Sequence, residues 1–219
     1  MRLRLRHLYR VAPLVVVGVV GLSVAGCLAP HYTYVSDNAD NAYFKVPPSW
    51  HQVNESSLQS TEGPATQEGS YLWSEAYDSS AKPSVAHIFS ATSNPVAYAS
   101  VLSLSSTERN DISFNSMRDL LLPVTQAARS AAASAHENLS GFASVSDQVI
   151  TDSHNNRGIR EIFQYNFNGT PETFDLTVMT NAATTKLYFL LVQCSTACFG
   201  DNYPEISNVV NSFTVGGGS

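Results

Sequence analysis

Apolar and polar residues alternate most clearly in the last third of the chain, and this pattern predicts β-strands. Residues 157–168 place their large apolar side chains on one face of an extended segment: Ile159, Phe163, Tyr165 and Phe167. Asn168-Gly169 is a strong turn signal. The next strand alternates in the same way through Phe174, Leu176 and Val178. Residues 187–192 are apolar on both faces, which is typical of a central strand covered on both sides.

The first half of the chain carries weaker strand signals. Residues 43–46 favour a strand that the double proline Pro47-Pro48 stops. Trp50 is expected to bury its ring against the sheet. Residues 52–70 are rich in Ser, Glu, Gly and Pro and predict a loop with room for one helical turn. Three further strands are predicted at 71–77, 85–90 and 96–104, with turns between them.

Two segments have the three-and-four spacing of an amphipathic helix. The first is 113–135, where Ser113 is a suitable cap and Pro123 predicts a break or kink. The second begins near Pro204-Glu205 and extends to Phe213, before a flexible tail at 216–219. The order of strands, helix, strands and helix predicts an α+β fold in which helices flank an antiparallel sheet.

The N-terminus has the pattern of a secretory signal. Four arginines precede an apolar run over residues 11–26, which is short for a membrane span. Val24-Ala25-Gly26-Cys27 resembles a bacterial lipobox, and the resemblance implies cleavage before Cys27 and a lipid on its sulfur. An uncleaved anchor and cleavage by an ordinary signal peptidase are the alternatives. Residues 27–41 are polar and predict a flexible tether, which leaves 42–215 as one folded domain.

Charge narrows the classes of partner. The whole chain has 12 basic and 18 acidic residues. Loss of the four arginines in residues 1–26 leaves eight basic residues and a net charge of −10. Such a domain is unsuited to nucleic acid or to electrostatic attachment to anionic lipid. The predicted contact with the membrane is therefore the lipid on Cys27, with the domain on the outer face of the cytoplasmic membrane.

Two stretches resemble PsbP-like domains. Residues 43–50, Tyr-Phe-Lys-Val-Pro-Pro-Ser-Trp, are similar to the strand, proline and tryptophan that begin such domains. The apolar strand at 187–192 and the later segment 206–215 are similar to their ending. The resemblance covers residues 42–215 and implies an α-β-α sandwich, mostly without enzymatic activity and with no catalytic residues to transfer. Actinobacterial surface lipoproteins of the mycobacterial LpqN type share this architecture.

Two cysteines remain once Cys27 is assigned to lipid. Cys194 and Cys198 form an even pair in an oxidising compartment, which predicts a disulfide between the last strand and the last helix. Metal binding would require more ligands, and redox motifs usually have two intervening residues rather than three. No metal or cofactor site is predicted.

Candidate catalytic residues are few. His87 lies in an apolar segment, where a hydrogen-bonded core histidine is the more usual interpretation. Ser79 precedes Lys82 by three residues without the supporting motifs of a serine hydrolase, which favours a polar turn. Glu161 is predicted on the same face as Phe163, either as a functional carboxyl with a raised pKa or as the partner of an arginine such as Arg157.

The sequence supports three hypotheses for function. The first is a non-catalytic surface lipoprotein that binds a protein or an envelope lipid or glycan, with Trp50, Tyr71 and Trp73 as candidate contacts. The second is a carrier of an apolar ligand in a cavity between sheet and helix. The third is a hydrolase with a dispersed Ser/His/Asp site.

Overall fold

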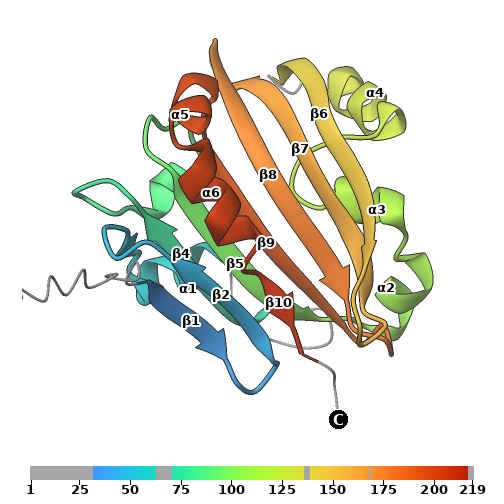
Figure 1. The fold of residues 1–219 in the computed structure, drawn as a ribbon. Coiled ribbons are helices and arrows are strands. Elements are labelled where there is room, and N and C mark those ends of the chain that lie inside the picture. The colour runs from blue at the N-terminus through green and yellow to red at the C-terminus, as the bar shows by residue number, and fades with distance from the viewer. Residues whose placement is uncertain (1–31, 63–70, 136–138, 168, 217–219) are drawn as a thin grey trace, which may run out of the picture. The chain divides into compact units, whose positions relative to one another are not determined.

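A seven-stranded antiparallel sheet forms the centre of the fold (Figure 1). The computed structural model describes residues 32–62, 71–135, 139–167 and 169–216. Across the sheet the strands follow the order β3-β4-β5-β9-β8-β7-β6. Their bounds are β3 (His51–Gln52), β4 (Tyr71–Asp78), β5 (Val96–Ser103), β6 (Ser140–Thr151), β7 (Arg157–Phe167), β8 (Thr170–Thr180) and β9 (Lys186–Ser195).

A second, three-stranded sheet has the order β1-β2-β10. It consists of β1 (Thr33–Asp37), β2 (Ala42–Val46) and β10 (Thr214–Val215). The prediction of a flexible tether through residue 41 is therefore wrong from Thr33 onward, because β1 pairs with β2 along its whole length. Gly216 extends this region by donating its N–H to the carbonyl of Asn41 at 2.8 Å. The signal segment, Cys27 and residues 217–219 lie outside the described residues.

The two faces of the main sheet bury different cores. On β9, Leu187, Phe189 and Leu191 belong to one core, while Leu190 and Val192 belong to the other. Successive side chains of a strand point to opposite faces, so the first core fills one face and the second core fills the other. The prediction that this strand is covered on both sides is confirmed.

Short helices cover the first face. They are α1 (Glu55–Glu62), the 3-10 helix η1 (Val85–Ile88), α2 (Ser106–Asp111), α3 (Phe114–Arg118) and α4 (Gln126–Ser134). Leu58, Ile88 and Met117 are their buried contributions to the first core. The second face carries α5 (Thr196–Asp201) and α6 (Tyr203–Val210), which cross in front of β8 and β9 in Figure 1. The predicted class, α+β with helices flanking antiparallel strands, is confirmed.

Two predicted elements differ in the structure. Residues 85–90 do not form a strand, because Ser84 caps η1 and the carboxylate of Asp78 accepts the Ser84 N–H at 3.1 Å. The single helix expected over 113–135 is divided into α3 and α4 by a turn. Asp119 holds that turn by accepting the N–H groups of Val124 and Thr125 at 2.8 and 2.7 Å. The side chain of Asp119 therefore interrupts the helix over several residues. The prediction from Pro123 was only a break or kink.

The C-terminal hairpin follows the predicted pattern closely. Phe167 pairs with Thr170, so residues 168 and 169 connect β7 to β8, and Gly169 has a φ of 84°. Glycine tolerates this left-handed conformation without steric cost. The outer strand β6 was not predicted, because it is an edge strand whose side chains are mostly polar and exposed.

Candidate functional site

A pocket of about 160 Å³ opens between the first face of the main sheet and the segments that follow β4 and α3. Tyr98, Phe163 and Phe174 form its floor on the sheet, and Leu121 and Leu122 form one wall. Phe89, which directly follows η1, also lines the pocket and is 56% exposed, so it marks the mouth. An apolar cavity of about 150 Å³ is large enough to hold benzene, so this pocket accommodates a ligand fragment of similar size.

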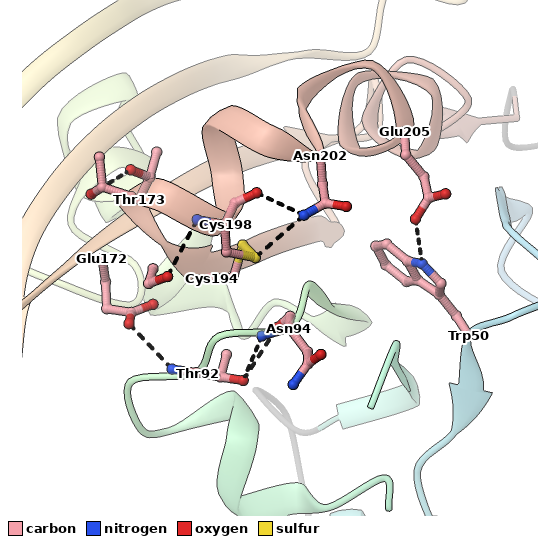
Figure 2. Close-up of a disulfide and its surroundings, with 11 residues drawn as sticks. Trp50, Thr92, Asn94, Glu172, Thr173, Cys194, Cys198, Asn202 and Glu205 are labelled. Carbon is pink, nitrogen blue, oxygen red and sulfur yellow. Dashed lines mark hydrogen bonds between the residues drawn. A yellow bond between two sulfur atoms is a disulfide. The ribbon is translucent and has the colours of Figure 1, made fainter. Parts of the chain in front are cut away.

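One carboxyl group lies in this apolar wall. Glu172 of β8 is 1% exposed and faces the same side of the sheet as Phe174. Its Oε1 accepts the backbone N–H of Thr92 at 3.2 Å, as Figure 2 shows. Its Oε2 is buried and receives no hydrogen bond from the described residues. Burial raises the pKa of Glu172 to about 7, although the Thr92 N–H acts in the opposite direction.

The segment over the pocket is fixed to the sheet by hydrogen bonds. Gln193 of β9 donates its side-chain nitrogen to the carbonyls of His87 and Ile88 at 3.0 and 2.8 Å. Further along, the Ser195 N–H donates to the carbonyl of Thr92 at 2.7 Å. Both ends of the 87–92 segment are therefore tied to one strand, which makes the pocket a preformed feature.

The disulfide lies beside this region (Figure 2). It joins Cys194 at the end of β9 to Cys198 in α5, with a Cα–Cα distance of 5.9 Å. The side chain of Asn202 donates to the carbonyl of Cys198 at 2.8 Å. The bridge thus fixes the entry of the C-terminal helices on the second face, which is the role expected for a short loop.

A larger groove of about 560 Å³ lies on the second face, between α5, α6 and strands β6–β8. Its polar groups are largely paired with one another. Arg160 donates to both oxygens of Asp175 at 3.0 and 2.8 Å, and Thr173 bonds to Thr196 at 3.0 Å. These groups stabilise the fold and are less available to a ligand than the free oxygen of Glu172.

The three aromatic residues predicted as contacts do not form one surface. Trp50 is buried in the second core and donates its Nε1–H to Glu205 at 2.7 Å (Figure 2). Trp73 packs on the same side against Phe44, with ring centroids 6.4 Å apart. Tyr71 packs against the first core, because a register shift between 71 and 73 changes the face that the strand presents.

The pair Asp78 and His87 has the geometry of two members of a catalytic triad, with 2.6 Å between Oδ2 and Nδ1. Asp78 is fully buried and also accepts the N–H groups of Ser80 and Ser84. Burial tends to raise the pKa of Asp78, but these hydrogen bonds outweigh it and lower the pKa. All of these contacts lie within residues 78–87, and together they hold this turn in place.

Glu161 occupies a second buried acidic position. It lies between Ile159 and Phe163 on β7, as predicted, and is 3% exposed. Its arginine neighbour is Arg118, with 3.9 Å between Nε and Oε2, and not Arg157. Burial, reinforced by Asp147, raises the pKa of Glu161 to about 7 against the opposing effect of Arg118.

These two carboxyl groups predict that stability falls between pH 5 and pH 8. Their pKa values rise from 4.5 in the unfolded chain to about 7 in the folded one, so folding binds protons in this window. The contribution of these two groups to stability is fully present below pH 4.5 and is lost as the pH rises through 7. Each group should contribute about 2 kcal/mol to the difference. Urea unfolding of the Glu161→Gln, Glu172→Gln double variant should show a gain over wild type that grows from pH 5 to pH 8.

Exposed Asp201 supplies the control for this pH experiment. Asp201→Asn should change the free energy of unfolding by less than about 0.5 kcal/mol. A gain in the double variant that is equal at pH 5 and pH 8 would contradict the assignment of the two buried carboxyl groups.

Comparison with known proteins identifies the fold. No family model matches the sequence, and no curated protein matches it. The structure is similar to CyanoP, the cyanobacterial PsbP of Synechocystis sp. PCC 6803, with a TM-score of 0.52 over 89% of this chain and 98% of that chain. Sequence identity is 11%. The chain therefore has a PsbP-like fold.

Two other solved structures share part of this arrangement. The Ran-binding protein Mog1p of Saccharomyces cerevisiae has a TM-score of 0.44 at 11% identity, over 85% of this chain and 96% of that chain. PA94 of Pseudomonas aeruginosa has a TM-score of 0.43 at 14% identity, over 86% of this chain and 99% of that chain.

Within the described residues, no three His, Cys, Asp or Glu side chains gather as metal ligands. None of the described helices is long and apolar enough to cross a membrane.

Proposed function

We propose that this chain is a non-catalytic binding protein whose PsbP-like domain receives a small apolar ligand in the pocket beside Glu172. The preformed pocket between sheet and helices is the observation that carries the proposal. Ligand sites are typically apolar concavities with a few placed polar groups, and this pocket combines aromatic walls with one buried carboxyl group. Of the three hypotheses from the sequence, this arrangement favours the carrier over the hydrolase.

The proposal includes attachment to the outer face of the cytoplasmic membrane through a lipid on Cys27. The lipobox-like sequence at 24–27 supports it, as does the architecture of the LpqN-type lipoproteins that the sequence resembles. Only five residues separate Cys27 from the start of β1 at Thr33, a reach of about 20 Å when extended. The domain would therefore work close to envelope lipids and glycans. An intact N-terminus without acyl mass on protein from native cells would overturn this attachment.

Toluene should bind to the pocket and raise the melting temperature. Its ring matches the cavity, and a ligand that binds only the folded state stabilises it by mass action. In a 1H–15N NMR titration, shifts should concentrate on Phe89, Leu121 and Leu122. Leu122→Trp should fill the pocket and abolish the shifts. Val145 lies on the second face and is 58% exposed. Val145→Trp should therefore leave the toluene-induced shifts unchanged.

Wild-type protein with neither shifts nor a higher melting temperature in saturating toluene would show that the pocket is not a ligand site. Equal shifts in wild type and Leu122→Trp would place any binding elsewhere.

A further inference from the structure

Glu172 lines an apolar pocket, and its Oε2 is an acceptor that receives no donor from the described residues. The Thr92 N–H serves only Oε1, and Oε2 is buried. A buried polar group without a partner is unfavourable, and a buried charge without a partner is more so. An acceptor placed in this way within a ligand pocket points to a donor on the ligand.

None of the polar groups that line the pocket donates to that oxygen. Gln193 lies across from Phe174, close to Glu172, but its two amide hydrogens already serve the carbonyls of His87 and Ile88. None of the residues that line the pocket, all in the described part of the chain, is Lys or Arg. The pocket therefore offers one negative charge and no cation to balance it.

Titratable groups on the surrounding elements leave this charge uncompensated. His87 of η1 directs its Nδ1 to Asp78, and Tyr98 of β5 and Tyr165 of β7 are phenols. Arg129 of α4 stacks on Phe142 with 4.1 Å from Cζ to the ring centroid and donates to the carbonyl of Val124. Because no lysine or arginine of the described residues lines the pocket, we expect the cation that pairs with Glu172 to come with the ligand.

We propose that the ligand of this pocket is a small apolar amine, whose protonated nitrogen donates to Oε2 of Glu172 while its hydrocarbon part lies among Tyr98, Phe163 and Phe174. This inference rests on the proposed binding function and specifies its ligand class. A charge-assisted hydrogen bond is stronger than a neutral one, and the apolar surroundings strengthen it further. The remaining N–H groups of the amine can reach water at the mouth beside Phe89, which is 56% exposed.

Benzylamine, benzyl alcohol and toluene form a matched set of probes for the amine. They share one ring and differ in charge and donor capacity. Calorimetric or NMR titration of the full domain at pH 8 should give benzylamine an affinity at least about tenfold higher than that of toluene or benzyl alcohol. Glu172→Gln should remove this preference and leave toluene affinity within about twofold, because the amide keeps the shape of the site without its charge.

The pH dependence of benzylamine affinity in the wild-type protein tests the role of Glu172 without a substitution. The pKa of free Glu172 is about 7, so the carboxylate that binds an ammonium group is scarcer at pH 6 than at pH 8. Benzylamine should therefore bind about five- to tenfold more tightly at pH 8, whereas toluene should bind equally at both values. This comparison remains valid even if the substitution at Glu172 impairs folding.

The outcomes separate the two proposals. Binding of toluene with no advantage for benzylamine would overturn the amine while leaving the pocket as an apolar site. Failure of all three probes would overturn both the pocket function and the amine. A benzylamine preference that persists in Glu172→Gln would also overturn the role of this carboxylate.

Discussion

Replacing Arg160 with methionine should lower the free energy of unfolding by about 3–5 kcal/mol at pH 8. Arg160 donates through Nε and a terminal nitrogen to the two oxygens of Asp175, which is fully buried in the main sheet. Without the guanidinium, folding must bury an uncompensated carboxylate. Methionine keeps much of the apolar stem, so the loss reports mainly on charge. Urea unfolding followed by tryptophan fluorescence measures it.

Two controls separate the charge effect from lost packing. The double variant Arg160→Met, Asp175→Leu should recover most of the stability, because it removes the buried charge together with its partner. Arg109→Met, at an exposed position in α2, should change stability by less than about 0.5 kcal/mol. Burial raises the pKa of Asp175, so the deficit of Arg160→Met should also shrink as the pH is lowered. A deficit below 1 kcal/mol at pH 8 would contradict the pairing.

Replacing Gly158 with alanine should cost about 3 kcal/mol or more. Gly158 pairs with Met179 across β7 and β8, and an added Cβ would lie 1.8 Å from the carbonyl oxygen of Val178. The atoms that it meets belong to the backbone, so relief requires the two strands to separate locally. Circular dichroism and urea unfolding of the variant should show a folded protein with a much lower midpoint.

Gly200 gives the matched control for this glycine substitution. It lies in α5 with no atom within 4 Å of an added Cβ. Gly200→Ala should therefore stabilise the protein by about 0.5–1 kcal/mol through lower entropy of the unfolded chain. Equal changes in the free energy of unfolding for Gly158→Ala and Gly200→Ala would show that contact with β8 does not cause the destabilisation.

Strong periodicity in the sequence corresponds to elements that the structure contains. The strand at 157–168 was predicted because its apolar residues recur with period two, and the strand at 187–192 because it is apolar on both faces. The burial of each strand on the sheet follows its pattern. The final helix was predicted from Pro204-Glu205 and the spacing of Ile206, Val209 and Val210, all of which are buried. These signals are local, so they remain readable without knowledge of the partners.

Elements that depend on partner strands or on side-chain hydrogen bonds were missed or misassigned. β1 is polar and was predicted as tether, but its backbone hydrogen bonds to β2 make it a strand. Residues 85–90 have strand-like composition, yet the carboxylate of Asp78 draws them into a 3-10 turn. β6 lies at a sheet edge where few side chains need to be apolar.

The candidate pocket had almost no signature in the sequence. A cavity between sheet and helix was predicted as a possibility for the fold, but no pattern pointed to Glu172. One glutamate among strand residues is common, and only its burial beside Phe174 and an open pocket sets it apart. The aromatic candidates Trp50, Tyr71 and Trp73 were chosen from composition, which does not reveal the face on which a side chain lies.

Sequence alone determined the class of fold and the order of the regular C-terminal elements, because both depend on patterns among neighbouring residues. Tertiary structure alone decided which polar groups are buried, which are paired and where a pocket stays open. Those properties arise from side chains far apart in the chain, as between Thr92 and Glu172, and their energies depend on the loss of water around them. No local pattern of residue types contains that information.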